Sequence, residues 1–413
     1  MVIRHCVERL GQNVLRRAPP APVPGGRCVV RCLAVLPLVP YPPDRGDRLR
    51  AWDMLTALAE FSELHVALVV REAADPAAEV ALDGLARGVH RLPLSSREVW
   101  RGRVAGAVQG VPPGIAAYWS GRARRALVQE CPGPWDLAVA FQLRSAPYAQ
   151  ALNARVRLLE MTDSLSLYRR RLPRRGRALA QRLALTGIER LERRLPRAFT
   201  ACVVSAEEDA DTVERLSGRR PLVVPNGTRP TREPRPYRTD GPLLFVGDMR
   251  YPPNEDGIVW FVRAVWPEVR RRLPDLTLRV VGRTTPRVLR LGSEAGVEIA
   301  GYVADIGAEF DRALAVVNPV RYGSGTNRKV LDAWGAARPV LSTPAGVRGL
   351  PCRDGEHLVV AEAPGEWGAA VERLRGEPAY GEGLGEEGRA LLLEVLRPSD
   401  GWRAACGRVL GEV

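Results

Sequence analysis

Short apolar runs alternate with longer amphipathic segments along most of the chain. The short runs are rich in valine, leucine and alanine, as strands are when a parallel sheet is covered on both faces. The longer segments repeat their apolar residues at helical spacing. This alternation predicts an α/β protein built on parallel sheets.

The runs form two successive groups with the same rhythm. In the first group we predict a helix at 49–60 and strands at 28–37, 64–70, 89–94, 135–141, 156–161, 200–205 and 222–227. In the second we predict a helix at 258–273 and strands at 241–248, 277–282, 297–303, 313–320 and 339–343. Two similar Rossmann-like halves predict a cleft between them, which is a usual place for ligands.

The segment between the groups, TRPTREPRPYRTDG, is rich in proline and arginine and has no periodicity, which is typical of a linker. We therefore expect a flexible N-terminal tail at 1–27, a first domain at 28–227, a linker at 228–240, a second domain at 241–395, and a C-terminal helix at 396–413 that packs back on the first domain. The tail has no apolar core of the signal-peptide type, so we do not expect secretion.

Composition narrows the class of protein. At 413 residues and 46% hydrophobic composition, the chain is long enough for two domains. No apolar run approaches the ~18 residues of a membrane-spanning helix. The seven cysteines are scattered and contain no CxxC pair, which favours reduced thiols in a cytoplasmic protein. The four histidines are too dispersed to predict a metal site.

The formal net charge of +14 is concentrated in one stretch. Residues 168–197 hold eleven arginines and two glutamates, with Leu179, Leu183, Ile188 and Leu191 at helix-like intervals. A basic amphipathic helix can lie on an anionic membrane surface. It can equally be the solvated face of a packed helix in a protein that favours arginine. Aromatic residues make up only 6% of the chain and no nucleic-acid-binding signature occurs, so we do not expect nucleic acid as a partner.

Only one of the 61 basic residues is a lysine, Lys329, and it lies in the segment GSGTNRKVLDA. The loop Gly323-Ser324-Gly325-Thr326 follows a predicted strand and opens a predicted helix, so its backbone N–H groups can meet an anion such as a diphosphate. Lys329 would then supply positive charge, and Asp332 could accept hydrogen bonds from a ribose. Chance survival of one lysine beside an ordinary capped helix is the alternative.

The segment GSGTNRKVLDAWGAARPVLSTPAGVRGL resembles the nucleotide-sugar motif of the family 4 glycosyltransferases, which are retaining enzymes of the GT-B fold. VVSAEEDADTV, LVVPNGT and LLFVGDMRYPPNEDGIVWFVRAVWPEV are similar to further segments of that family, in the same order along the chain. LLEMTDSLSLY and ERLERRLPRAFTACVVSAEE fit a subgroup found with exopolysaccharide genes. The resemblance covers roughly residues 28–361 and implies a first domain for the acceptor and a second for the sugar nucleotide.

The resemblance also implies roles for individual residues. Gly323, Ser324, Gly325 and Thr326 would hold the diphosphate, Lys329 would neutralise it, and Asp332 would bind the ribose. Further donor-binding positions would be Gly46, Gly247, Arg250, Arg283, Gly301 and Tyr302, and Asp163 would face the cleft as a second catalytic candidate. The only cofactor-like molecule implied is the nucleotide diphosphate sugar itself, and no metal is required.

This chain departs from the family pattern at three positions. Ser324 replaces a glutamate that many members place against the transferred sugar, Asp248 stands where a basic residue is usual, and Asp332 is shorter than the usual glutamate. The resemblance implies transfer of a sugar to a glycan or lipid-linked acceptor, in the cytoplasm or at the inner face of the membrane. A nucleotide-sugar epimerase and a non-catalytic protein of the same fold are the alternatives.

Overall fold

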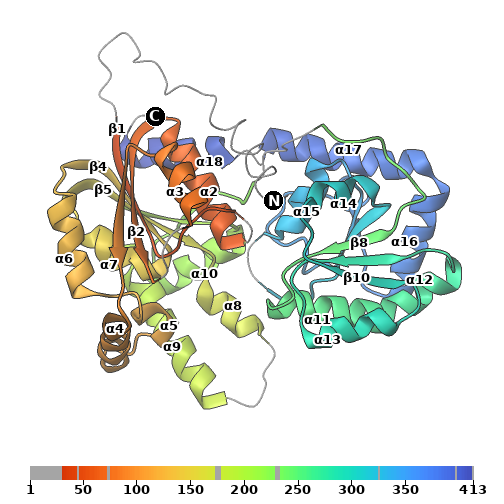
Figure 1. Cartoon of the computed structure of the whole chain (residues 1–413), viewed down its shortest axis with the longest axis horizontal. Coiled ribbons are helices and arrows are strands. Elements are labelled where there is room, and N and C mark those ends of the chain that lie inside the picture. Colours follow the sequence, from red (N-terminus) through yellow and green to blue (C-terminus); the bar gives the residue numbers. More distant parts are fainter. Residues whose placement is uncertain are drawn as a thin grey trace, which may run out of the picture.

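The computed structural model describes residues 30–43, 46–71, 75–172, 178–227, 233–323, 326–395 and 398–411. The predicted tail at 1–27, linker residues 228–232 and the predicted site residues Ser324 and Gly325 lie outside these ranges. Figure 1 shows two α/β domains side by side along the longest axis of the molecule. Each domain contains one parallel sheet with helices on both faces.

The first domain contains a seven-stranded sheet with the order β3-β2-β1-β4-β5-β6-β7. Its strands are β1 (Val30–Leu36), β2 (Ser62–Val70), β3 (Gly88–Pro93), β4 (Trp135–Phe141), β5 (Ala154–Thr162), β6 (Ala201–Val204) and β7 (Leu222–Val223). The second contains a six-stranded sheet with the order β10-β9-β8-β11-β12-β13. Its strands are β8 (Leu243–Val246), β9 (Leu278–Val281), β10 (Val297–Gly301), β11 (Ala315–Asn318), β12 (Val340–Ser342) and β13 (Val359–Val360).

Both sheets reverse their strand order next to the first strand, between β1 and β4 and between β8 and β11. In open parallel sheets, ligands bind outside the carboxyl ends of the strands at such a reversal. The strands at these positions are almost continuously apolar, as strands buried on both faces must be. The topology therefore directs attention to the residues that follow β8 and β11.

Helices connect the strands of the first domain. They are α2 (Gly46–Ala59), α3 (Pro76–Asp83), α4 (Ser96–Val108), α5 (Pro113–Ala116), α6 (Gly121–Glu130), α7 (Gln142–Ala151), α8 (Leu165–Arg171), α9 (Ala178–Arg194), the 3-10 helix η1 (Pro196–Ala198) and α10 (Glu207–Ser217). One apolar core lies between the sheet and α4 to α7, α9 and α10, and a second lies between the sheet and α2, α3 and the C-terminal helix.

The helices of the second domain follow the same plan. They are α11 (Pro252–Trp260), the π-helix η2 (Phe261–Val265), α12 (Trp266–Arg272), α13 (Pro286–Leu289), the 3-10 helix η3 (Arg290–Ser293), α14 (Ile306–Arg312), α15 (Arg328–Gly335), α16 (Pro364–Gly376) and α17 (Pro378–Val395). Helices α11, α12 and α16 cover one core, and α14, α15 and α17 cover the other.

The chain returns to the first domain at its C-terminal end. After α17 on the second domain, α18 (Pro398–Leu410) packs beside α2, as Figure 1 shows. Trp402 of α18 is fully buried there, and the guanidinium of Arg50 lies 5.2 Å from its ring centroid. Arg50 also donates to both carboxylate oxygens of Glu160, at 3.1 and 3.2 Å.

The predicted strands of both halves overlap observed strands, so the α/β prediction and the parallel pairing are confirmed. The predicted helix at 258–273 extends further toward the N-terminus, because Pro252 and Pro253 begin α11 and proline is tolerated in the first turn of a helix. Short β13 has no counterpart in the predictions, since two residues are too few for a recognisable apolar run.

Candidate functional site

The only lysine of the chain is buried at the start of α15. Lys329 is 8% exposed, and its Nζ donates to Asn254 Oδ1 at 2.8 Å and to Asn318 Oδ1 at 3.4 Å. The same Nζ lies 4.9 Å from the ring centroid of Phe245 in β8. Asn318 is the last residue of β11, and Asn254 lies in the first turn of α11. Three elements of the second domain therefore converge on the ammonium.

The partners of this ammonium are neutral. Among the described residues, no carboxylate oxygen lies within 4.0 Å of Lys329 Nζ. Burial without a counter-ion disfavours the charged form, and it lowers the pKa of Lys329 to about 7. An anionic group that arrived here would raise this pKa again and hold the proton. We call the residues around the ammonium, Phe245, Asn254 and Asn318, the Lys329 pocket; they supply two hydrogen-bond acceptors and no counter-ion.

The glycine-bearing loop connects β11 to α15, the helix that contains Lys329. Gly323 has φ +148°, a backbone conformation that favours glycine, and a Cβ there would lie 3.7 Å from Tyr251 Oη. Thr326 Oγ1 is buried and has no hydrogen-bond partner in the described part of the chain. Gly247 follows β8, and a Cβ there would lie 2.8 Å from Asn254 Nδ2. Gly247 thus lies beside Asn254, which is a hydrogen-bond partner of Lys329, and Thr326 lies three residues before Lys329 in the sequence.

Other predicted donor residues pair with neighbouring side chains or are exposed. Asp332 accepts from Arg328 Nε at 3.3 Å. Arg250 forms an exposed ion pair with Asp248, which lowers the pKa of that carboxyl. Tyr302 is 71% exposed, and a Cβ at Gly301 would meet no atom within 4 Å.

Arg283 lies close to this group. Its carbonyl accepts from the backbone N–H of Met249 at 2.8 Å, and its charge also lowers the pKa of Asp248. Arg283 and Asp248 therefore lie on the loops that follow β9 and β8, at the carboxyl end of the second sheet.

The first domain contributes a second group of residues. Asp163 follows β5 and accepts from Ser205 Oγ at 2.9 Å, and burial raises the pKa of this carboxyl. Nearby Asp209 accepts from the backbone N–H of Ser164, and burial together with the charge of Asp163 raises the pKa of Asp209 to about 7. Gly46 begins α2, and a Cβ there would meet no atom within 4 Å, so its backbone is open to approach.

The two groups face one another across the domain boundary. Arg171 of α8 donates to the Gly323 carbonyl at 2.9 Å and to Glu208 at 2.8 Å. The rings of Tyr168 and Tyr251 stack with centroids 6.1 Å apart. Burial raises the pKa of the Tyr251 hydroxyl, and the charge of Asp163 contributes. At this boundary, α8 of the first domain therefore contacts the second domain at Gly323, in the loop expected to hold a diphosphate, and at Tyr251.

A half-buried ion pair also joins the domains beside this loop. Arg328 of α15 donates to Asp53 of α2 at 2.9 Å and to the Gly227 carbonyl at 2.7 Å. Arg328 and Lys329 are therefore neighbours in sequence with opposite surroundings, because the arginine is fully paired and the lysine faces amides.

Sequence reasoning did not assign roles to Asn254, Asn318 or Arg171. The asparagines lie 75 and 11 positions from Lys329, so only the fold reveals the contact. One signal for Asn318 was available, because a polar residue that ends a buried strand must find a partner. Arg171 was one of many arginines in a basic stretch, and nothing in its neighbours distinguished it.

Two features of other proteins are lacking in the part of the chain that the structure describes. No group of three or more histidine, cysteine, aspartate or glutamate side chains is arranged there to hold a metal ion. None of the helices in those ranges combines the length and the apolarity needed to cross a bilayer.

A protein-family comparison matches residues 241–376, which comprise most of the second domain, to the model described as glycosyl transferases group 1. The chain is also 28% identical over 128 residues to an uncharacterized 44.6 kDa protein in the cps region of Klebsiella pneumoniae. That match covers 29% of this chain and 33% of the relative, so the chain spans about a third of the length of the curated relative it matches.

Solved structures extend the likeness to both domains. The Anabaena HepE structure with UDP and glucose has a TM-score of 0.66 at 14% identity, over 93% of this chain and 100% of that one. Sucrose-phosphate synthase from Thermosynechococcus elongatus has a TM-score of 0.67 at 15% identity, over 92% and 98%. At such identities the likeness shows the fold alone, and this fold is GT-B, as the sequence predicted.

Proposed function

We propose that this chain, whose residues 241–376 match the group 1 glycosyl transferases, transfers a sugar from a nucleotide diphosphate sugar to a glycan or lipid-linked acceptor. The observation that carries the proposal is the burial of Lys329 against two neutral amides. A buried cation without a counter-ion is costly unless an anion joins it during function. The diphosphate of the donor is such an anion.

The residues around Lys329 suit the rest of the donor. Thr326 Oγ1 and the backbone of the loop at Gly323 supply hydrogen-bond donors for phosphate oxygens. Asp332 lies one turn along α15 from Arg328, and its carboxylate could accept from a ribose hydroxyl. Arg283 and Gly301, at the ends of β9 and β10, would lie beside the base. The context of the Klebsiella relative supports polysaccharide synthesis as the setting.

The proposed reaction retains the configuration of the sugar. The acceptor oxygen forms a bond to the anomeric carbon on the face from which the diphosphate departs. The bond between the anomeric carbon and the diphosphate oxygen breaks, and the acceptor proton passes to that oxygen. Such a step requires stabilisation of the departing charge, and we assign this role to the ammonium of Lys329, which has no counter-ion of its own among the described residues. Asp163, on the acceptor side, would orient the acceptor hydroxyl.

Calorimetry with UDP, GDP and TDP, followed by incubation of labelled sugar nucleotides with a membrane extract, tests the proposal. We expect one nucleotide diphosphate to bind and its sugar to appear in lipid or polymer. An altered free sugar nucleotide without transfer would instead indicate an epimerase. Failure of all three nucleotides to bind would remove both enzymatic functions.

A further inference from the structure

Helix α4 presents an apolar stripe to the solvent. Trp100 is 64% exposed, Val104 46% and Val108 87%. Their spacing of four residues places all three on one face of the helix. The opposite face is held tightly in the domain, because a Cβ at Gly102 would lie 2.4 Å from the Ala116 carbonyl oxygen. The stripe therefore cannot turn inward without separating α4 from α5.

Three arginines flank this stripe. Arg97, Arg101 and Arg103 are exposed, and within the described ranges no carboxylate oxygen lies within 4.0 Å of their guanidinium groups. The one acidic residue of α4, Glu98, accepts a hydrogen bond from Arg122 Nε at 2.9 Å instead. The stripe thus has apolar residues along its middle and uncompensated positive charge on both sides.

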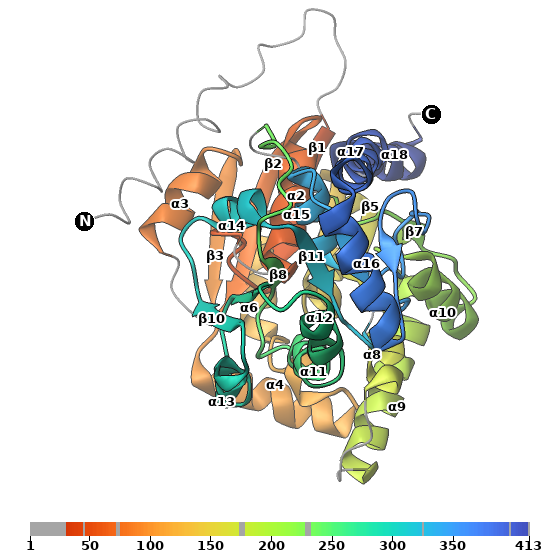
Figure 2. The same ribbon diagram turned by 90° about the vertical axis from the view of Figure 1, so that its right-hand side faces the viewer.

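Helix α9 continues the same surface. A Cβ at Gly187 would lie 2.4 Å from the carbonyl oxygen of Gly110, so α9 crosses close to the turn that ends α4. Leu183 is 66% exposed, and Arg190 lies two turns further on the same face. Figures 1 and 2 both show α4 and α9 along one side of the first domain. The basic stretch predicted to be amphipathic thus lies beside the apolar stripe.

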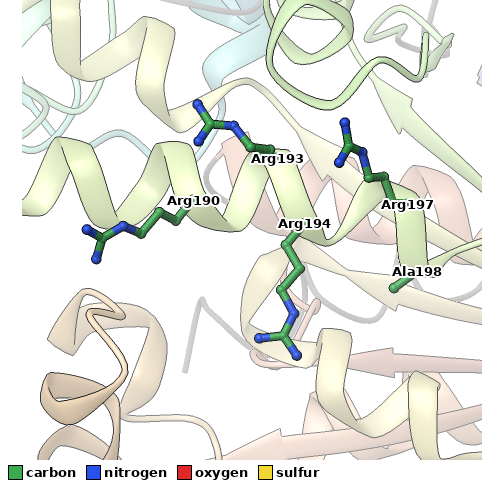
Figure 3. A pocket seen from close by; sticks show the side chains of 5 residues that line it. All are labelled: Arg190, Arg193, Arg194, Arg197 and Ala198. Carbon is green, nitrogen blue, oxygen red and sulfur yellow. The ribbon is translucent and has the colours of Figure 1, made fainter.

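The end of α9 adds a concentration of charge. A hollow of about 350 Å³ is lined by Arg190, Arg193, Arg194, Arg197 and Ala198, as Figure 3 shows. Arg197 donates to the Ser217 carbonyl at 2.7 Å, whereas Arg190, Arg193 and Arg194 form no ion pair within the described part of the chain. Figure 3 shows Arg190 and Arg194 extending to the same side of the helix.

We propose that this surface lies on an anionic lipid bilayer. We call it the α4–α9 face, and its members are Arg97, Trp100, Arg101, Arg103, Val104, Val108, Leu183, Arg190 and Arg194. A tryptophan among aliphatic side chains suits the region between headgroups and acyl chains, and unpaired arginines suit lipid phosphates. The charges favour a bilayer over a neutral protein partner. Trp100 is the one aromatic among these members, and a single ring offers too few stacking platforms to favour single-stranded RNA.

The proposed donor site and the α4–α9 face lie in different domains, so the proposal for one can be wrong while the proposal for the other holds. The second domain binds the sugar nucleotide, whereas the α4–α9 face belongs to the first domain, which would bind the acceptor. A first domain held on a bilayer would reach acceptors that are themselves membrane-bound. UDP binding measured on the same samples therefore reports on the proposed reaction and not on the lipid contact.

Co-sedimentation of the full chain with phosphatidylcholine vesicles, with and without phosphatidylglycerol, tests the proposal. We expect the anionic vesicles to bind at least ~10-fold more tightly, because each basic residue near such a surface contributes a factor of about five. The triple variant W100S/V104S/V108S and the pair R190Q/R194Q should each reduce binding at least ~10-fold. Because all five side chains are exposed, neither variant should change UDP affinity or the thermal midpoint.

Matched substitutions outside the face serve as controls. Val80 on α3 is 60% exposed and Arg87 is exposed beyond the same helix, so V80S/R87Q changes comparable groups at another place. This variant should bind vesicles as the unaltered chain does. Lipids brominated in their acyl chains should quench part of the tryptophan fluorescence, and W100F should lose that part.

Several results would overturn the lipid proposal. Equal binding to neutral and anionic vesicles, no binding to either, or equal losses in the control variant would each do so. Tighter binding to single-stranded RNA than to anionic vesicles would assign the arginines to a nucleic acid. A concentration-dependent dimer that W100S/V104S/V108S abolishes would assign the stripe to a second copy of the chain.

Discussion

Two cationic regions of this molecule, the pocket of Lys329 and the α4–α9 face, use positive charge in opposite ways. The pocket holds one ammonium, almost wholly buried and surrounded by amide oxygens and a phenyl ring. The face holds several guanidinium groups in contact with water. The buried cation has a pKa lowered to about 7, whereas exposed arginines stay charged at any ordinary pH.

This difference teaches which properties a charge can confer. A buried cation acts at short range, is little screened by salt, and can be neutral when its ligand is absent. Exposed cations act additively and are screened by salt, and each one contributes modestly. A specific diphosphate site needs the first kind of charge, and a broad anionic surface needs the second. The following predictions test whether the two regions are separated in this way.

The largest expected effect is at Lys329. Lys329→Ala should lower kcat at least ~10²-fold, because loss of one preorganised donor to a departing charge typically has this effect. Lys329→Arg should lose nearly as much, since a planar guanidinium does not fit between Asn254 and Asn318 as an ammonium does. Steady-state rates with the identified donor measure both variants.

The α4–α9 triple variant W100S/V104S/V108S is the control for this loss, and it should keep its kcat on a soluble acceptor. Near-normal turnover of Lys329→Arg would show that only the charge matters, and it would remove the distinction drawn here between the two kinds of cation.

The second prediction introduces a counter-ion. Asn254→Asp would place a carboxylate about where the amide oxygen now lies, 2.8 Å from Lys329 Nζ. The pair would raise the pKa of Lys329 and compete with the diphosphate, so UDP affinity should fall ~10-fold in calorimetry. Asn318→Asp should have a smaller effect, because its oxygen is 3.4 Å away. A larger loss of UDP affinity in Asn318→Asp than in Asn254→Asp would show that the shape of the amides matters, rather than their lack of charge.

The third prediction concerns pH. The pKa of Lys329 in the free protein is about 7, well below its ordinary value, so the ammonium is progressively lost above that pH. UDP affinity should therefore decrease as pH rises from about 7 to 9, by up to tenfold per unit, and should not decrease with falling pH for this reason. The slope should disappear in Lys329→Ala. Binding to anionic vesicles should stay constant over the same range, since arginine does not titrate there.

The smallest expected effect is that of salt on UDP binding. Raising ionic strength from about 0.05 to about 0.3 M shortens the screening length to well below ~10 Å and should weaken vesicle binding several-fold. UDP affinity should change less than ~3-fold, because Lys329 is buried. Equal sensitivity of the two binding reactions would mean that Lys329 meets its ligand in open solvent.

The fold was predictable from sequence because its signals are local. Strands such as β4 and β11 are almost continuous apolar runs. Such runs can be recognised in the sequence without knowing how the strands pack. The contacts of Lys329 were not predictable in the same way. The ammonium lies between Asn254 and Asn318 only because β8, β11 and α11 meet at the reversal of the sheet. The roles assigned to Asp163, Gly46 and the other donor residues stay predictions.

The exposed surface shows a second limit of prediction from the sequence. Trp100, Val104 and Val108 repeat at helical spacing, which is also the pattern of a helix that faces a core. Leu183 belongs to the same amphipathic series as Ile188, yet Leu183 is 66% exposed and Ile188 3%. Periodicity tells which residues share a face, and only the neighbouring elements determine whether that face is covered.

The return of α18 to the first domain means that the chain passes between the domains twice, once between 227 and 233 and once between 395 and 398. The first domain is therefore assembled from two separate stretches of the chain, 30–227 and 398–411, with the second domain between them in the sequence. Trp402 anchors the second attachment. A truncation after residue 395 would therefore remove a buried side chain from the first domain, although it would leave the second domain whole.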